Sequence, residues 1–132
     1  MNEIEERAVW LKHNGYNCCQ SVIKALTEAD ESVSDAERDL LNRVASGFRT
    51  GMGGMEATCG ALSGAVMIAG LKSPDTIVAG KTAKQMHERF TELSGASICK
   101  VLKSRRPDGH FVCDCDDCVR HGVRVFHELV EK

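Results

Sequence analysis

The chain has 132 residues, of which 42% are hydrophobic and 27% charged, and this suits one domain (1–132) that can bury a core. Its 17 basic and 19 acidic residues give a formal net charge of -2 without a long block of either sign, which argues against nucleic-acid and anionic-membrane partners. The N-terminal sequence lacks a signal peptide's apolar stretch, and the apolar run 60–71 is too short to span a bilayer. We therefore expect a cytoplasmic protein.

Two helices are predicted in the first thirty residues. Apolar residues recur at helical spacing over 3–13, and Gly15 follows as a stop. Asn17 is a good N-cap for a second helix, which opens on Cys18 and Cys19. The residues expected to be buried on these helices are Ile4, Ala8, Trp10, Leu11, Cys19, Val22, Ile23 and Leu26.

A third helix is predicted over 35–46, because Ser34 and Glu37 form a capping box. Its expected buried residues are Leu40, Leu41, Val44 and Ala45. The stretch RTGMGGMEAT, residues 49–58, is predicted to be a glycine-rich turn that lets the backbone pass close to a sulfur site. It is not followed by the Lys-Ser/Thr pair of a phosphate-binding loop.

The second half of the chain predicts further helices. One runs from Thr58 to about residue 71, and Gly60 and Gly64 on it favour close packing. A long helix over 75–93 follows, with Pro74 in its first turn and with Val78, Met86, Phe90 and Leu93 on its apolar side.

The remaining elements are a short helix capped by Ser97, a loop over 104–111 and a last helix over 117–130. No strand is expected. The predicted fold is all-α, a compact bundle of five to seven helices with short loops.

Seven cysteines in a chain without a recognisable export signal favour a chemical role for the thiols. In a reducing compartment structural disulfides are rare, and clustered thiols more often bind metal or perform redox reactions. Four segments each place a cysteine at a predicted helix start: Cys18, Cys59, Cys99 and Cys115. Unpaired backbone N–H groups and the helix dipole favour an anionic sulfur there. The alternative for any one cysteine is a small core residue.

Five segments resemble, in order, the C_GCAxxG_C_C family of small helical proteins to which a redox role is attributed: NCCQSV, ASGFRTGMGG, TCGALSGAVMIAGLK, SICKVL and CDDCVRHGVRVFHELV. The resemblance implies a module that is redox active or holds an iron or iron-sulfur centre, and the family is also similar to part of the split-Soret cytochromes. Carried over by position, its cysteines are Cys18, Cys59, Cys99 and Cys115. They are the expected cofactor and metal ligands.

The chain departs from the family pattern in two ways. The element GCAxxG reads CGALSG here, with glycine and cysteine exchanged around Cys59. Three further cysteines, Cys19, Cys113 and Cys118, could replace or supplement a family ligand. His110 and His121 flank the CDCDDC cluster as minor candidates for a metal ligand.

Three functions remain open from sequence. The first is an electron-transfer protein with an iron or iron-sulfur centre, which would need a redox partner protein. The second is a zinc-stapled structural or interaction domain without catalysis, although a second C-x-x-C pair for a zinc ribbon is missing. The position after Cys118 is not histidine, which disfavours covalent haem.

The third is a thiol-disulfide oxidoreductase, with Cys18 and Cys59, or Cys115 and Cys118, as the cycling pair. The neighbouring aspartates, Asp114, Asp116 and Asp117, would raise the pKa of Cys113, Cys115 and Cys118 and so disfavour that use. A homodimer through the face of Gly60 and Gly64 is a further expectation.

Overall fold

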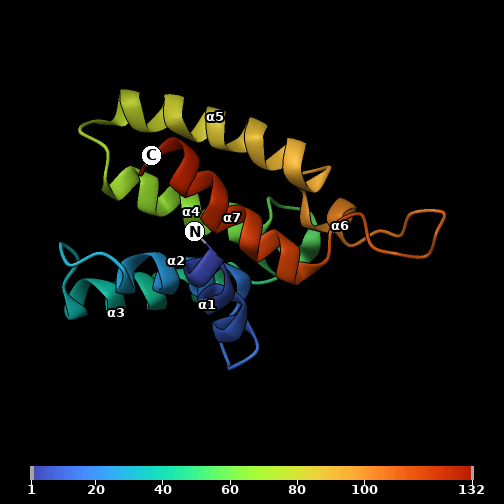
Figure 1. The fold of residues 1–132 in the computed structure, drawn as a ribbon, viewed down its shortest axis with the longest axis horizontal. Coiled ribbons are helices and arrows are strands. Elements are labelled where there is room, and N and C mark those ends of the chain that lie inside the picture. Colours follow the sequence, from blue (N-terminus) through green and yellow to red (C-terminus); the bar gives the residue numbers. More distant parts are fainter. Residues whose placement is uncertain (1, 132) are drawn as a thin grey trace.

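The computed structural model describes residues 2–131, and seven α-helices make up most of them (Figure 1). They are α1 (Asn2–Lys12), α2 (Cys18–Glu28), α3 (Asp35–Val44), α4 (Gly60–Leu71), α5 (Thr76–Ser94), α6 (Cys99–Leu102) and α7 (Cys115–Leu129). A 3-10 turn, Ala45–Gly47, extends α3, and a π-helical turn, Gly51–Met55, precedes α4. In this described part the β-structure is limited to two isolated bridges, so the all-α prediction is confirmed.

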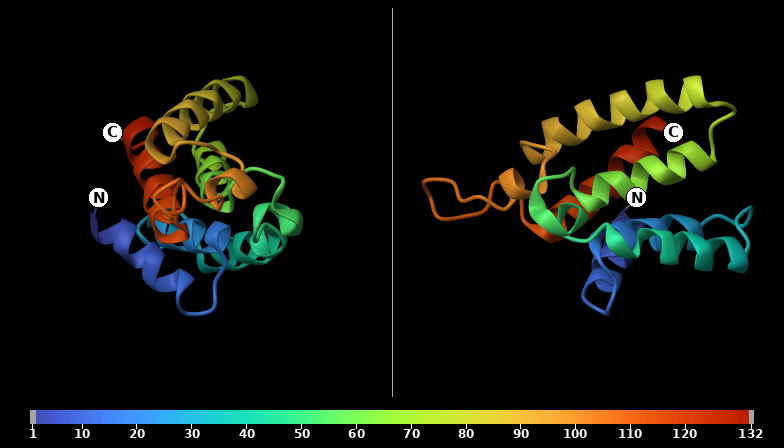
Figure 2. Two further views of the ribbon diagram at one scale, coloured as in Figure 1. Left: turned by 90° about the vertical axis from the view of Figure 1, so that its right-hand side faces the viewer. Right: turned by 180° about the vertical axis from the view of Figure 1, so that it is seen from behind.

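Helices α4 and α7 lie in the middle of the molecule, with α5 along one side of them and α1, α2 and α3 along the other (Figures 1 and 2). The core between these layers is aliphatic and aromatic, and its largest fully buried side chains are Phe90, Phe126, Leu11, Ile23, Leu62, Ile68, Met86 and Leu102. None of the helices in the described range is both long and apolar enough to cross a membrane.

Close helix packing depends on glycine at three positions. A Cβ atom at Gly64 would lie 2.7 Å from the carbonyl oxygen of Cys19, and one at Gly60 would lie 2.7 Å from that of Phe48. A Cβ atom at Gly122 of α7 would lie 2.6 Å from the carbonyl oxygen of Ala61. The close approach expected at Gly60 and Gly64 is therefore confirmed, and it joins α4 to the first turn of α2.

The predicted caps are mostly confirmed. Asn17 caps α2 and Ser34 caps α3, each with a complete capping box. The prediction is wrong at Ser97, whose hydroxyl contacts His87 Nε2 at 2.9 Å while Ile98 is the N-cap of α6. The boundaries also shift: α4 begins at Gly60 rather than at residue 58, α5 begins after its N-cap Asp75 with Pro74 outside it, and α7 begins at Cys115.

The expected burial holds for all four positions on α2 and in part for α1 and α5, where Ala8, Leu11, Met86 and Phe90 are buried. Cys19, Val22, Ile23 and Leu26 are all buried. Leu40 and Val44 are instead 52% and 55% exposed, because α3 packs at the edge of the bundle and none of its residues is buried. Trp10 and Val78 are exposed as well, so four of the residues expected in the core lie on the surface.

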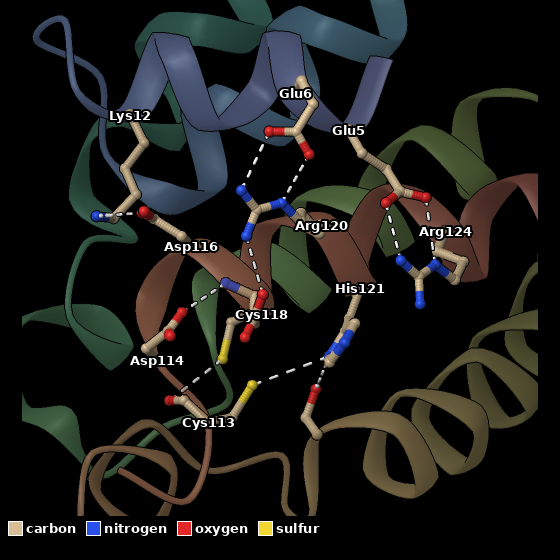
Figure 3. A network of polar contacts seen from close by, with 12 residues as sticks. Glu5, Glu6, Lys12, Cys113, Asp114, Asp116, Cys118, Arg120, His121 and Arg124 are labelled. Atoms are coloured by element: carbon tan, nitrogen blue, oxygen red, sulfur yellow. Dashed lines mark hydrogen bonds and ion pairs between the residues drawn. The ribbon is translucent and has the colours of Figure 1, made fainter. Parts of the chain in front are cut away.

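Ion pairs hold α1 against α7 at the end of the bundle that carries Cys115. The carboxylate of Glu5, which is 4% exposed, accepts two hydrogen bonds from Arg124, and Glu6 accepts two from Arg120 (Figure 3). Lys12 Nζ donates to Asp116 at 3.0 Å, next to Cys115 in the chain. A separate ion pair, Asp30 with Lys72, links the C-terminal ends of α2 and α4.

Residues 103–114 form a loop that projects from the helices beyond α6 (Figures 1 and 2). The loop turns back on itself, since Arg105 pairs with Phe111 in an isolated bridge and Arg106 N–H donates to His110. Gly109 adopts a φ of 88° at its tip. The loop returns the chain to the start of α7, where Asp114 is the N-cap.

Candidate functional site

Six of the seven cysteines line one small cavity of about 20 Å³ at the end of the bundle where α2, α4, α6 and α7 begin. The volume is roughly that of one water molecule. Its other lining residues are Thr50, Gly51, Gly60, Leu102 and Lys103. The cavity wall therefore carries six thiols, one cation and no carboxylate. We call this space the sulfur cavity.

The four cysteines carried over from the family each sit at a helix start. Cys18, Cys99 and Cys115 are the first residues of α2, α6 and α7, and Cys59 is the N-cap of α4. The four side chains come from segments up to 97 residues apart in the chain and face one cavity. Free N–H groups at helix starts favour an anionic sulfur, but the four sites differ. The pKa values of Cys59 and Cys115 are lowered, whereas that of Cys18 is raised and burial raises that of Cys99.

Backbone contacts join the segments of Cys59 and Cys99. The amide of Cys59 donates to the carbonyl group of Ser97 at 2.7 Å, and the amide of Cys99 donates to that of Ala57 at 3.0 Å. Gly51 closes this side of the sulfur cavity, because a Cβ atom there would lie 2.8 Å from Cβ of Cys99. Its φ of 57° is also left-handed, so the site requires glycine. The glycine-rich stretch thus runs beside the sulfur site, as the sequence predicted.

Cys18 and Cys115 form a sulfur pair between α2 and α7. Contact with Cys18 is the main reason that the pKa of Cys115 falls to about 6, and the nearby ammonium group of Lys103 lowers it further. Contact with Cys115 and burial raise the pKa of Cys18. The net effect on Cys115 is a lowered pKa, although the aspartates beside it in the chain were expected to raise it.

Cys118 lies between two other sulfurs, Cys59 and Cys113. Contact with Cys118 lowers the pKa of Cys59, helped by the amides of Ala61 and Leu62, and it lowers that of Cys113 to about 5. The pKa of Cys118 itself is raised by contact with Cys113 and Cys59 and by burial. Cys118 is thus the proton-carrying member of this group.

His121 contacts the cysteines from outside the sulfur cavity. Its Nδ1 atom is 3.9 Å from Sγ of Cys113 and 2.7 Å from Oγ of Ser94 (Figure 3). His110, the other histidine weighed from sequence, is exposed on the projecting loop. Neither histidine lines the sulfur cavity.

Cys19 is the one cysteine that the sulfur cavity excludes. It is fully buried beneath α4, against Gly60 and Gly64, and burial raises its pKa to about 12. Cys19 packs as a small core residue, and Cys18 next to it reaches the cavity.

Sequence reasoning did not single out Lys103, which lies against the pair of Cys18 and Cys115. The sequence does contain a signal for Lys103: it lies four residues after Cys99, and residues i and i+4 share a helix face, so the lysine could have been expected near that sulfur. Lys12, the other lysine near Cys115, carries no such signal, since its approach depends on how α1 docks on α7.

All seven cysteines are free thiols in the structure. Within residues 2–131, no group of three or more His, Cys, Asp or Glu side chains is already arranged to hold a metal ion. The cysteines therefore share a cavity without forming a preassembled ligand shell.

Comparison with known proteins identifies one family. The match extends over residues 16–129 and is to the family described as "Putative redox-active protein (C_GCAxxG_C_C)". A search of curated proteins and a search of solved structures each found no match. Since the match spans all seven cysteines and every helix from α2 to α7, the chain belongs to the C_GCAxxG_C_C family.

Proposed function

We propose that this chain is an electron-transfer protein that binds iron, as a single ion or as an iron-sulfur centre, through Cys18, Cys59, Cys99 and Cys115. The observation that carries the proposal is the gathering of six thiols from four helix starts around one cavity. The family's redox character supports the same reading. A redox partner protein would exchange electrons with the centre.

The donor set fits iron by its chemistry. Thiolates are the ligands of iron-sulfur clusters and also bind single iron or zinc ions. Because the sulfur cavity holds about 20 Å³ and no ligand shell is preassembled, loading requires the cysteine side chains to reorient. A single ion needs less of this rearrangement than a cluster. A bound iron centre would supply one-electron redox chemistry.

The surrounding residues would stabilise such a centre. The amides of Ala61 and Leu62 bond the sulfur of Cys59 at the start of α4, and Lys103 adds a positive charge at the cavity wall. The buried side chain of Leu102 limits access of water. Free thiols on this scale suit a reducing compartment, so we propose a cytoplasmic location.

A second candidate function is thiol-disulfide exchange through Cys18 and Cys115. The observation that favours it is that Cys18 and Cys115 line the same small cavity, where the pKa of Cys115 is lowered and that of Cys18 is raised. A nucleophilic thiolate beside a resolving thiol is the arrangement that dithiol enzymes use. Their bond would join α2 to α7.

Anaerobic purification, followed by visible absorption and by iron, sulfide and zinc analysis, tests the proposal. We expect coloured protein with stoichiometric iron. Colourless protein with stoichiometric zinc would contradict it in favour of a zinc-stapled domain, and metal-free protein with a disulfide between Cys18 and Cys115 would support the second candidate.

Two adjacent cysteines give a matched pair of variants. Cys18→Ala should lose the iron, because Cys18 lines the sulfur cavity, whereas Cys19→Ala should keep it, because Cys19 packs beneath α4. Equal iron content in the two variants would contradict the assignment of Cys18 as a ligand.

A further inference from the structure

A second, larger hollow lies beside the sulfur cavity. It is an open cleft of about 420 Å³ between the end of α5, the projecting loop and the start of α7. Its polar lining includes Arg106 and His110 from the loop, and Asp114, Asp117 and His121 from the region of α7. Binding sites for small molecules have volumes of this order.

Cys113 forms part of the wall of both hollows. It lines the open cleft and also the sulfur cavity. The residue is 8% exposed, and the open cleft that it lines offers an approach to it from solvent. Behind it, Cys118 also lines the sulfur cavity, and its Sγ donates to the carbonyl oxygen of Cys113 at 3.8 Å. Figure 3 shows Cys113 and Cys118 together, with His121 on the cleft side.

We propose that Cys113 and Cys118 form an exchange dithiol that reacts with a small disulfide bound in this cleft. This activity goes beyond the iron centre and uses the two cavity cysteines that do not correspond to family ligands. The substrate class is a low-molecular-weight disulfide that carries both ammonium and carboxylate groups, such as cystine.

This substrate class is chosen because the cleft is lined by charged side chains of both signs. Arg106 offers a guanidinium group to a carboxylate, and its side chain is 51% exposed, with one nitrogen paired to Asp108. Asp114 and Asp117 also line the cleft, at the start of α7. Oδ1 of Asp114 accepts from the amide of Asp117 and Oδ1 of Asp117 accepts from Arg120, so each carboxylate offers its other oxygen to an ammonium group. A ligand with charges of both signs can therefore pair with both kinds of side chain.

The reaction balances without another oxidant. The thiolate sulfur of Cys113 attacks one sulfur of the small disulfide RSSR, whose S–S bond breaks and releases RS⁻. Sγ of Cys118 then attacks Sγ of Cys113 in the mixed disulfide, its proton passes to a released thiolate, and the second RS⁻ leaves. The protein loses two electrons and one disulfide is reduced, which yields RSH, RS⁻ and a bond between Cys113 and Cys118.

The test treats the anaerobically purified protein with cystine and, separately, with hydroxyethyl disulfide, which lacks charges. Alkylation and peptide mass spectrometry then locate the bonds, and each rate is divided by that of the same disulfide with a free thiol. We expect a disulfide between Cys113 and Cys118, formed about tenfold faster with cystine, since one charge-assisted hydrogen bond provides roughly that factor. Equal normalised rates would overturn the substrate class.

Two variants locate the binding and the chemistry. Arg106→Ala should slow the reaction with cystine about tenfold and leave that with hydroxyethyl disulfide unchanged. Arg43→Ala is the control, because Arg43 lies on α3, pairs with Asp39 and does not line the cleft. Cys118→Ser should trap a mixed disulfide on Cys113.

Other results would overturn the proposal and leave the iron centre standing. A mixed disulfide on a different cysteine would exclude Cys113 as the attacking group. Loss of iron from Cys113→Ser would place this sulfur among the metal ligands. If Cys118→Ser does not fold, the bond map of the unmodified chain and the two arginine variants still decide the outcome.

Discussion

Replacement of Gly64 by alanine tests how closely α2 and α4 must approach. The new Cβ atom would lie 2.7 Å from the carbonyl oxygen of Cys19, far inside ordinary contact distance, and that oxygen belongs to a helix backbone. Overpacking of this kind costs about 1–3 kcal/mol, and we expect the upper end because backbone cannot rotate away. Alanine recovers about 1 kcal/mol of helix propensity. The net loss in free energy of unfolding should be about 1–2 kcal/mol.

Gly70 provides the control on the same helix, since nothing lies within 4 Å of its added Cβ atom. Gly70→Ala should raise the free energy of unfolding by up to about 1 kcal/mol. Urea unfolding followed by circular dichroism measures both variants. Gly64→Ala should also retain less iron, because moving α2 carries Cys18 away from Cys59. Stabilisation by both alanines would refute the close packing and, with it, this link between helix spacing and the sulfur cavity.

Further predictions concern three charged side chains. Asp30→Asn should reduce the dependence of the free energy of unfolding on pH in acid, because the ion pair with Lys72 lowers the pKa of Asp30 from 3.8 to about 2. The stabilisation from Asp30 is full above pH 3.8 and is lost as the pH falls through 2. Urea unfolding across this range should show a contribution of about 1 kcal/mol or less. Glu5→Ala should reduce the free energy of unfolding by about 1–3 kcal/mol, since it removes the buried partner of an arginine; an unchanged urea midpoint would contradict this. In metal-free protein, Lys103→Met should raise the pKa of Cys115 above about 6, as measured by the pH dependence of alkylation, and an unchanged profile would show that the lysine is screened.

The helices could be predicted from the sequence because their starts are local events. Asn17 and Ser34 accept hydrogen bonds from residues only three positions away, so the capping boxes are visible in the sequence. The buried stripe of α2 is similarly regular. These local signals also identified four cysteines at helix starts, although the helix boundaries shifted by up to two residues.

The rest depends on contacts between distant segments. The apolar spacing of Leu40 and Val44 is helical, but whether another helix covers that face is decided by the bundle and not by α3. The local sequence pattern likewise does not decide whether Cys18 or Cys19 lines the sulfur cavity, because this depends on how α4 packs against α2. The contact of His121 with Cys113 likewise requires the projecting loop to return to α7.

The position of α7 at the end of the described chain has a consequence for biosynthesis. Ribosomes deliver the N-terminal segments first, so α2, α4 and α6 can emerge while Cys115 is still being added. Any metal captured before that moment would meet at most three of its four intended sulfurs. Completion of the proposed iron centre would therefore be a late event, coupled to docking of the last helix.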